Sequence, residues 1–137
     1  MSIQYRAIIT HQQDDRFFVQ FPAMNEAFTE GETLSEALLN AQEVLNLSLD
    51  GRLEDGLEIP PPDMEKLGEP EYLITPDASI QSALLIHFYR GNQSLTELAA
   101  VLGIPAQDIE NPKNNITIFG LEQIARAMGK HLVIDFA

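Results

Sequence analysis

The stretch of sequence that decides the fold covers residues 17–51 and reads FFVQFPAMNEAFTEGETLSEALLNAQEVLNLSLDG. A short β-rich run ends at Phe21, and Thr33 followed three residues later by Glu36 forms a capping box that starts a helix. After the cap, apolar residues recur at helical spacing, namely Leu34, Leu38, Ala41, Leu45 and Leu49. Gly51 stands where a left-handed C-cap belongs. The pattern therefore predicts strands followed by one helix that ends just before Gly51.

Further strands complete the predicted sheet. An alternating run places Ile3, Tyr5, Ala7 and Ile9 on one face of a first strand. The polar residues 11–15 form a turn, and residues 16–21 return as a second strand. Residues 28–30 make a third strand, and residues 57–59 are the candidate fourth. The first part is thus a small antiparallel β-β-β-α unit whose helix, Leu34–Asp50, covers one face of the sheet.

Proline and acidic residues divide the chain into two parts. Pro60-Pro61-Pro62 stops regular structure, and the acidic segment that follows is typical of a semi-rigid linker. Residues 71–74 are suited to a short strand that rejoins the sheet. We expect a first domain over residues 1–75, with the linker within residues 60–76, and a second domain over residues 77–137.

The second part is predicted to be helical until its last residues. The helical segments lie at residues 80–90, 94–102, 104–109 and 117–129. Ser94 and Glu97 form another capping box, and Thr117 can cap the last helix. Residues 131–136 alternate like a strand that has no local partner. They are therefore expected to join the sheet of the first part or a second chain, which predicts a dimer ribbon.

The net charge of −13 on 137 residues is unevenly distributed. Residues 1–75 hold fifteen acidic and four basic side chains, whereas residues 76–137 hold six and four. Because phosphate contact needs Lys and Arg, the first part is not expected to bind nucleic acid. The charge favours a basic protein partner, whose approach it would steer. An acidic surface that only confers solubility is the alternative.

Composition also disfavours several classes of protein. The chain has no cysteine, which removes disulfides and thiolate metal sites. The first residues resemble no signal peptide, and no apolar run approaches the roughly 20 residues of a membrane span. We therefore expect a cytoplasmic protein that does not act on a membrane.

No set of residues supports enzymatic chemistry. His11, His87 and His131 are scattered, without the spacing of a metal site. There is no Gly-rich phosphate loop, and the alternating strands do not present the converging carboxylates that a metal-dependent nuclease needs. We expect no catalytic residues, no metal and no cofactor.

The run from Leu98 to Ile109 resembles the helix-turn-helix of Xre/Cro-type DNA-binding domains. Ala99 is small where two helices would cross, Gly103 supplies the turn, and Ile104 and Ile109 would anchor the second helix to the core. Any small helical bundle with a tight turn is the alternative.

In the order of its parts the chain resembles HicB-type antitoxins of the helix-turn-helix branch. The first part matches the family pattern at Phe21-Pro22, Thr29, Gly31, Thr33-Leu34 and Glu36-Ala37. It departs from that pattern where Asn25-Glu26-Ala27 replaces the usual Pro-Gly-Cys. Asn111-Pro112-Lys113 and LEQIARAMGKHL at residues 121–132 are similar to the family's C-terminal domain.

The resemblance implies an α+β fold and two partners. The fold would be a small antiparallel sheet with one helix, similar to part of a ribonuclease H fold, followed by an all-α helix-turn-helix domain with a C-terminal strand. The first domain would sterically block a HicA-type toxin, a small basic ribonuclease that cleaves mRNA. The second would form a homodimer or tetramer and bind operator DNA as an autorepressor.

Candidate contact residues follow from this resemblance. The candidate toxin contacts are Asp14, Asp15 and Phe17 in the hairpin and Asn25 and Glu26 in the adjacent loop. The candidate DNA contacts are Thr96, Gln107, Asn111, Lys113 and Asn114. Gln and Asn can read adenine edges, whereas the neighbouring Asp108 and Glu110 would repel phosphate. The alternative is that this cluster is only the solvent-exposed face of a helix and contacts no DNA. A stand-alone helix-turn-helix regulator with a protein- or ligand-binding first domain is the alternative function.

Overall fold

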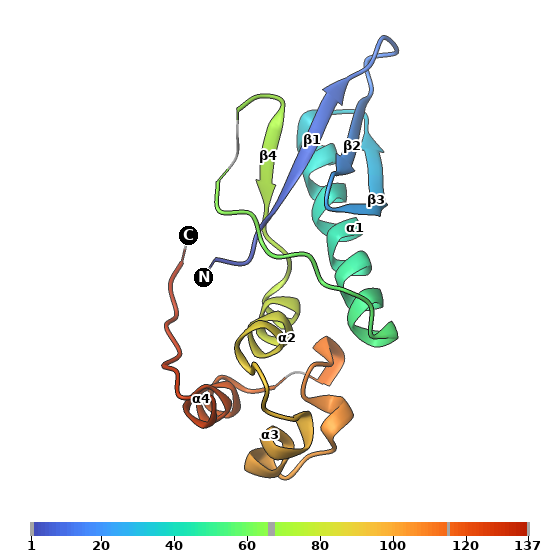
Figure 1. The fold of residues 1–137 in the computed structure, drawn as a ribbon. Helices are drawn as coiled ribbons and strands as arrows, with labels where there is room; N and C mark the ends of the chain where they lie inside the picture. The colour runs from blue at the N-terminus through green and yellow to red at the C-terminus, as the bar shows by residue number, and fades with distance from the viewer. Residues whose placement is uncertain (1, 66–67, 115, 137) are drawn as a thin grey trace. The chain divides into compact units, whose positions relative to one another are not determined.

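A computed structural model describes residues 2–65, 68–114 and 116–136 of the chain. These residues form an α+β fold (Figure 1) that divides into two compact units, one ending at Asp77 and the other beginning at Ala78. Each unit buries its own set of apolar side chains.

The first unit contains an antiparallel sheet. Its strands are β1 (Tyr5–His11), β2 (Phe17–Phe21), β3 (Met24–Gly31) and β4 (Glu71–Ile74), in the spatial order β3-β2-β1-β4. The predicted inward face of the first strand is confirmed, since Tyr5, Ala7 and Ile9 of β1 are buried, as is Ile3 just before it. The predicted strand at residues 71–74 is also confirmed, because Ile74 pairs with Tyr5 at the edge of the sheet.

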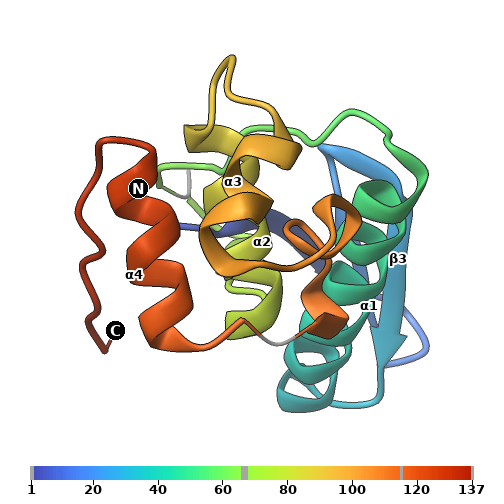
Figure 2. The same cartoon turned by 90° about the horizontal axis from the view of Figure 1, so that it is seen from below.

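Helix α1 (Leu34–Asp55) packs on one face of this sheet and runs beside β3 (Figure 2). The predicted cap is confirmed, because Thr33 Oγ1 accepts a hydrogen bond from the Glu36 N–H at 3.0 Å. The helix residues that are buried are Ala37, Ala41, Leu45, Ser48 and Leu49. At the entry to the helix, a Cβ added to Gly31 would lie 2.5 Å from the Ala37 nitrogen. Only glycine lets β3 approach the helix this closely.

The predicted end of this helix at Gly51 is wrong. The helix continues through Gly51 to Asp55, and the left-handed cap is Gly56, with φ 66°. Glycine inside a helix costs only about 1 kcal/mol relative to alanine. The last turn outweighs that cost because Arg52 is bound to Glu26 on β3.

The predicted strand at residues 57–59 is also wrong, since these residues form no strand and β4 occupies the place beside β1. The residues expected to form a linker are instead held on the sheet. The Tyr5 hydroxyl donates to the Pro60 carbonyl at 2.8 Å, and the Arg6 N–H donates to Asp63 Oδ2 at 2.8 Å. Burial raises the pKa of Tyr5, so its hydroxyl stays protonated and keeps donating.

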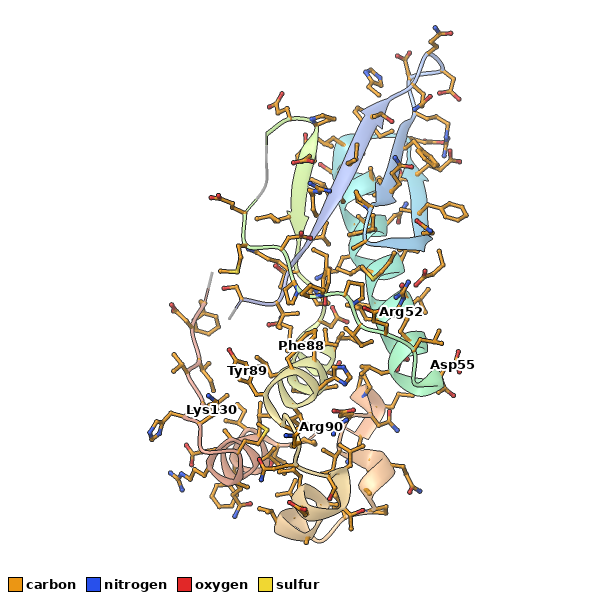
Figure 3. The ribbon with its side chains drawn as sticks, viewed as in Figure 1. Arg52, Asp55, Phe88, Tyr89, Arg90 and Lys130 are labelled. Atoms are coloured by element: carbon orange, nitrogen blue, oxygen red, sulfur yellow. The ribbon has the colours of Figure 1, made fainter. Side chains whose placement is uncertain are left out.

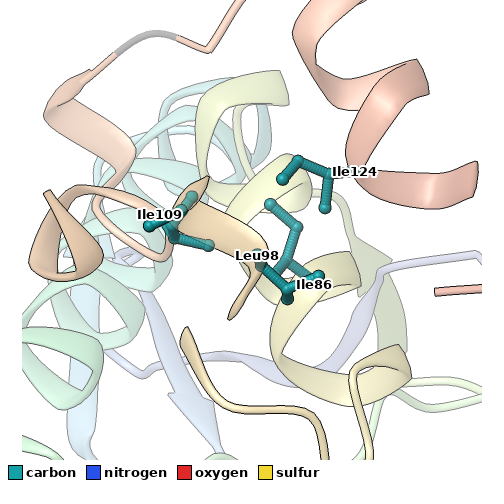
Figure 4. Packing of buried hydrophobic residues seen from close by; sticks show 5 residues of the cluster. Ile86, Leu98, Ile109 and Ile124 are labelled. Carbon is teal, nitrogen blue, oxygen red and sulfur yellow. The ribbon is translucent and has the colours of Figure 1, made fainter. Parts of the chain in front are cut away.

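The second unit contains α2 (Ala78–Tyr89), α3 (Leu95–Leu102) and α4 (Ile118–Ala127). Its core consists of Ile86, Leu98, Ala99, Ile109 and Ile124 (Figure 4). Both predicted caps are confirmed, since Ser94 Oγ accepts from the Glu97 N–H and Thr117 Oγ1 accepts from the Gly120 N–H.

Two expectations for this unit differ from the structure. The helix predicted from residues 104–109 is reduced to a 3₁₀ turn, η1 (Ala106–Asp108), followed by a second, η2 (Pro112–Asn114). Pro112 prevents a helix from continuing past Asn111, because it lacks the N–H that such a helix would need and disfavours helical geometry at Asn111. Residues 131–136 form no strand, since alternation produces a strand only where a second backbone pairs with it.

Candidate functional site

The hairpin between β1 and β2 places two carboxylates at an exposed tip. Asp15 adopts a left-handed conformation with φ 63°, and Asp14 Oδ1 accepts from the Arg16 N–H at 3.1 Å. Both aspartates are exposed to solvent. Phe17 is only half-buried, and its ring stacks on His11 with 4.5 Å between the ring centroids. The tip is therefore well defined and acidic.

The second pair of candidate toxin contacts lies on a strand rather than in a loop. Asn25 and Glu26 belong to β3, so the predicted loop at residues 24–27 is wrong. Asn25 is exposed. Glu26 is engaged with α1, where Arg52, labelled in Figure 3, donates from Nε at 2.6 Å and from Nη2 at 2.9 Å. The Ser48 hydroxyl donates to the same carboxylate.

This network fixes the charge state of Glu26. Hydrogen bonds from Arg52 lower the pKa of the Glu26 carboxyl to about 2, with a further contribution from Ser48. The same contact raises the pKa of Arg52. Arg52 also donates to the Glu58 carbonyl at 2.8 Å, which secures the chain after α1. Sequence reasoning missed Arg52 and Ser48, because their partner lies more than twenty residues away on another element.

Four of the five candidate DNA contacts lie close together in sequence around η1 and η2. Gln107, Lys113 and Asn114 are exposed, whereas Asn111 is half-buried. Asn111 Oδ1 accepts from the Lys113 N–H at 3.0 Å, so its side chain helps to shape the turn. Thr96, the fifth candidate, is exposed on α3, which packs against η1.

The structure weakens the expected repulsion of phosphate by Glu110, because this carboxylate has basic partners. Only 14% of the Glu110 side chain is exposed, and Arg90 Nε donates to it at 2.8 Å. His87 Nδ1 lies 3.4 Å from the same carboxylate. Glu110 therefore ties the η1–η2 segment to α2, and Arg90 balances its charge.

Two other basic residues of the second unit also have partners within it. Arg126 pairs with Glu122 at 3.2 Å along α4. The Lys130 ammonium lies 5.5 Å from the centroid of the Tyr89 ring (Figure 3). Arg126 and Lys130 therefore interact with these partners and not with the candidate DNA contacts.

Within the described ranges, no three His, Cys, Asp or Glu side chains are grouped so that they could hold a metal ion. Each helix in that same part of the chain is too short or too polar to serve as a membrane span.

Comparisons with known proteins agree with the arrangement of the first unit. Residues 5–75 match the family described as HicB-like antitoxin of bacterial toxin–antitoxin systems. The chain is 32% identical over 136 residues to "Antitoxin HicB 2" of Photorhabdus laumondii, which covers 96% of both chains. It is 30% identical over 135 residues to "Antitoxin HicB" of Escherichia coli K12, covering 95% of this chain and 96% of that one.

The β-β-β-α unit thus lies within the part of the chain that matches a family of antitoxins. The chain belongs to the family of HicB-like antitoxins.

Proposed function

We propose that the first unit binds and sterically neutralises a HicA-type toxin that cleaves mRNA. The observation that carries the proposal is the concentration of negative charge, −11 over residues 1–75 against −2 over the rest, in a chain similar along its length to HicB antitoxins. A protein that binds RNA offers Lys and Arg to phosphate, and carboxylates can occupy the same groups. A toxin that is bound in this way cannot bind mRNA.

We also propose that the second unit binds operator DNA, so that the protein represses its own operon. Helix α3 and the η1–η2 segment would act as a helix-turn-helix, with Gln107 and Lys113 toward the DNA. The β-β-β-α order of the first unit would correspond to part of a ribonuclease H fold without its catalytic carboxylates. The exposure of Gln107 and Lys113, and the pairing of Glu110 with Arg90, support this assignment.

Residues 131–136 are the proposed dimer contact. Val133 is 85% exposed and Phe136 is 98% exposed, and the segment borders a groove between α2 and the start of α4. A second copy that pairs with this extended segment would cover those apolar groups and set two DNA-binding units side by side. Removing residues 131–137 is expected to convert a dimer into a monomer in sedimentation velocity and to weaken operator binding. An unchanged sedimentation coefficient would place the dimer contact elsewhere.

The antitoxin function is tested by co-expression with the small basic protein encoded beside this chain. Expression of that protein alone is expected to arrest growth, and co-expression is expected to restore growth and yield a complex in a pull-down. If the neighbour is harmless or does not bind, the antitoxin assignment fails for this copy. A stand-alone DNA-binding regulator then becomes the better account.

A further inference from the structure

The outer face of α1 carries leucines and carboxylates that the fold does not use. Helical geometry puts Glu36, Leu39, Glu43, Leu47 and Glu54 on one side of the helix, because they are three, four or seven residues apart. We call these five residues the outer stripe. Leu39 is 58% exposed and Leu47 is 72% exposed, and the three glutamates are exposed as well. The opposite side of the helix faces the sheet and carries the side chains that are buried in the core.

The outer stripe has no counter-charge within its own helix. Arg52 is the only basic residue of α1, and its guanidinium is bound to Glu26 and to the Glu58 carbonyl. Among the residues that the structure describes, no basic side chain forms an ion pair with Glu43 or Glu54. The negative charge of this face is therefore available to a partner.

The opposite face of the sheet offers apolar area but little unbalanced charge. Phe28 is 57% exposed there, beside a shallow hollow that Ile8 and Phe18 help to line. Among the described residues, the ion pairs at this face are Arg6 with Glu71 at 3.2 Å and Arg16 with Glu30 at 3.2 Å, and Arg16 also pairs with Glu32 at 3.5 Å. The two exposed faces thus differ in the partner that they fit, and only the outer stripe combines apolar anchors with uncompensated acid.

We propose that the outer stripe is the surface by which this antitoxin holds its toxin, and that the toxin meets it with an apolar groove bordered by Lys and Arg. This inference rests on the proposed function. Leu39 and Leu47 act as anchors in the groove, since a helix that docks in a hydrophobic groove does so through apolar side chains on one of its faces. Glu43 and its neighbours pair with the basic border and speed the encounter.

The chemistry of the stripe disfavours the other occupants. Nucleic acid would be repelled by the same carboxylates. A second copy of this helix would set glutamate against glutamate, which costs binding energy without a compensating contact. A basic protein surface satisfies both the leucines and the acids.

The inference is tested with the full-length chain and the small basic protein encoded beside it. Toxin binding is measured by surface plasmon resonance at low and high salt, and neutralisation is measured as growth on co-expression. The stripe variants are the double substitution Leu39→Ser/Leu47→Ser and the single substitution Glu43→Gln. The matched controls are Phe28→Ser, which removes an equally exposed apolar side chain from the other face, and Glu97→Gln, which neutralises one exposed carboxylate of the second unit.

The double leucine variant is expected to weaken toxin binding by at least about tenfold, mainly through faster dissociation, and to abolish growth rescue. Glu43→Gln is expected to slow association about twofold at low salt and to have little effect at high salt. Both controls are expected to change the Kd by less than about twofold. Thermal unfolding identifies any variant that is misfolded, and Leu39→Gln and Leu47→Gln then replace the double variant.

Two results would overturn the inference and can be told apart. If Phe28→Ser loses binding while the leucine variant keeps it, the toxin sits on the sheet face, and the proposed function survives. If the wild-type chain itself does not bind the neighbouring protein, the proposed function fails and the inference falls with it.

Discussion

Single residues in this protein take their role from contacts that join distant parts of the chain. Glu26 is the clearest case, because a surface carboxylate on β3 receives hydrogen bonds from Ser48 and Arg52 on α1. Glu110 is another, since its carboxylate is held by Arg90, which follows the end of α2. Both side chains are acids in the sequence, yet each is partly neutralised within its unit.

Replacing Glu26 with Gln tests how much its charge stabilises the fold. The pKa of Glu26 in the folded protein, about 2, lies below its ordinary value of 4.5, so the charged pair stabilises the fold above about pH 4.5. That stability is lost as the pH falls toward 2. Because 48% of the Glu26 side chain is exposed, solvent screening reduces the effect to about 1 kcal/mol near neutral pH.

The measurement is urea denaturation of wild type and Glu26→Gln across this pH range. The two free energies of unfolding are expected to converge at acid pH, where the native carboxyl is protonated. Glu43→Gln is the control, since that side chain is exposed and forms no ion pair with the residues that the structure describes, so no change is expected. A constant difference at all pH values would show that charge is not the cause.

Replacing Lys113 with Glu tests the proposed DNA contact. Operator binding is expected to weaken, and the slope of log K against log salt is expected to fall by about one phosphate contact. Lys130→Glu makes the same charge change at a residue that lies over Tyr89, so it is the control. Equal slopes for the wild type and Lys113→Glu would mean that Lys113 does not touch DNA.

At the scale of elements, the packing of α1 against β3 sets the shape of the first unit. The helix begins next to Gly31, where there is no room for a side chain, and continues past Gly51, where there is no obstacle. Two glycines in one stretch of sequence therefore have opposite roles. One is required by a close approach of backbones, and the other only weakens a helix.

Alanine at these two positions is expected to act in opposite directions. Gly31→Ala should destabilise the protein by about 1–3 kcal/mol, because the new Cβ would lie 2.5 Å from the Ala37 nitrogen and the helix must shift. Gly51→Ala should stabilise it by up to about 1 kcal/mol, since nothing lies within 4 Å and alanine favours the helix. Thermal or urea denaturation of both variants measures the pair. A destabilised Gly51→Ala would contradict the continuous helix.

At the scale of the whole molecule, the first unit keeps its complete sheet only if the chain is cut after β4. Strand β4 lies beyond the proline-rich segment, and it pairs with β1 at the edge of the sheet. The Asp77 N–H donates to Asn46 Oδ1 at 2.9 Å, so the chain stays attached to α1 up to the end of the first unit.

Two truncations test this division. A fragment ending at Asp77 is expected to fold, neutralise the toxin and fail to bind operator DNA. A fragment ending at Pro70 lacks β4, exposes the edge of β1 and is expected to lose cooperative unfolding and neutralisation. Circular dichroism during thermal unfolding and the growth assay measure these outcomes. A folded Asp77 fragment that cannot neutralise would assign part of toxin binding to the second unit.

The sequence by itself determined the local structure of this protein. The helix caps at Thr33 and Ser94, the inward face of β1 and the helices α2, α3 and α4 follow from side chains that act on their own neighbours in the chain. The acidic character of residues 1–75 was equally plain.

Only the tertiary structure decided where elements end and which charges remain available. The extension of α1 past Gly51, the place of β4 beside β1 and the pairing of Glu26 with Arg52 all depend on residues far apart in sequence. Such contacts leave no periodic signal, because each is selected by the shape that the rest of the chain has taken. The same reason explains Leu39 and Leu47, whose exposure is known only once the opposite side of α1 has packed against the sheet.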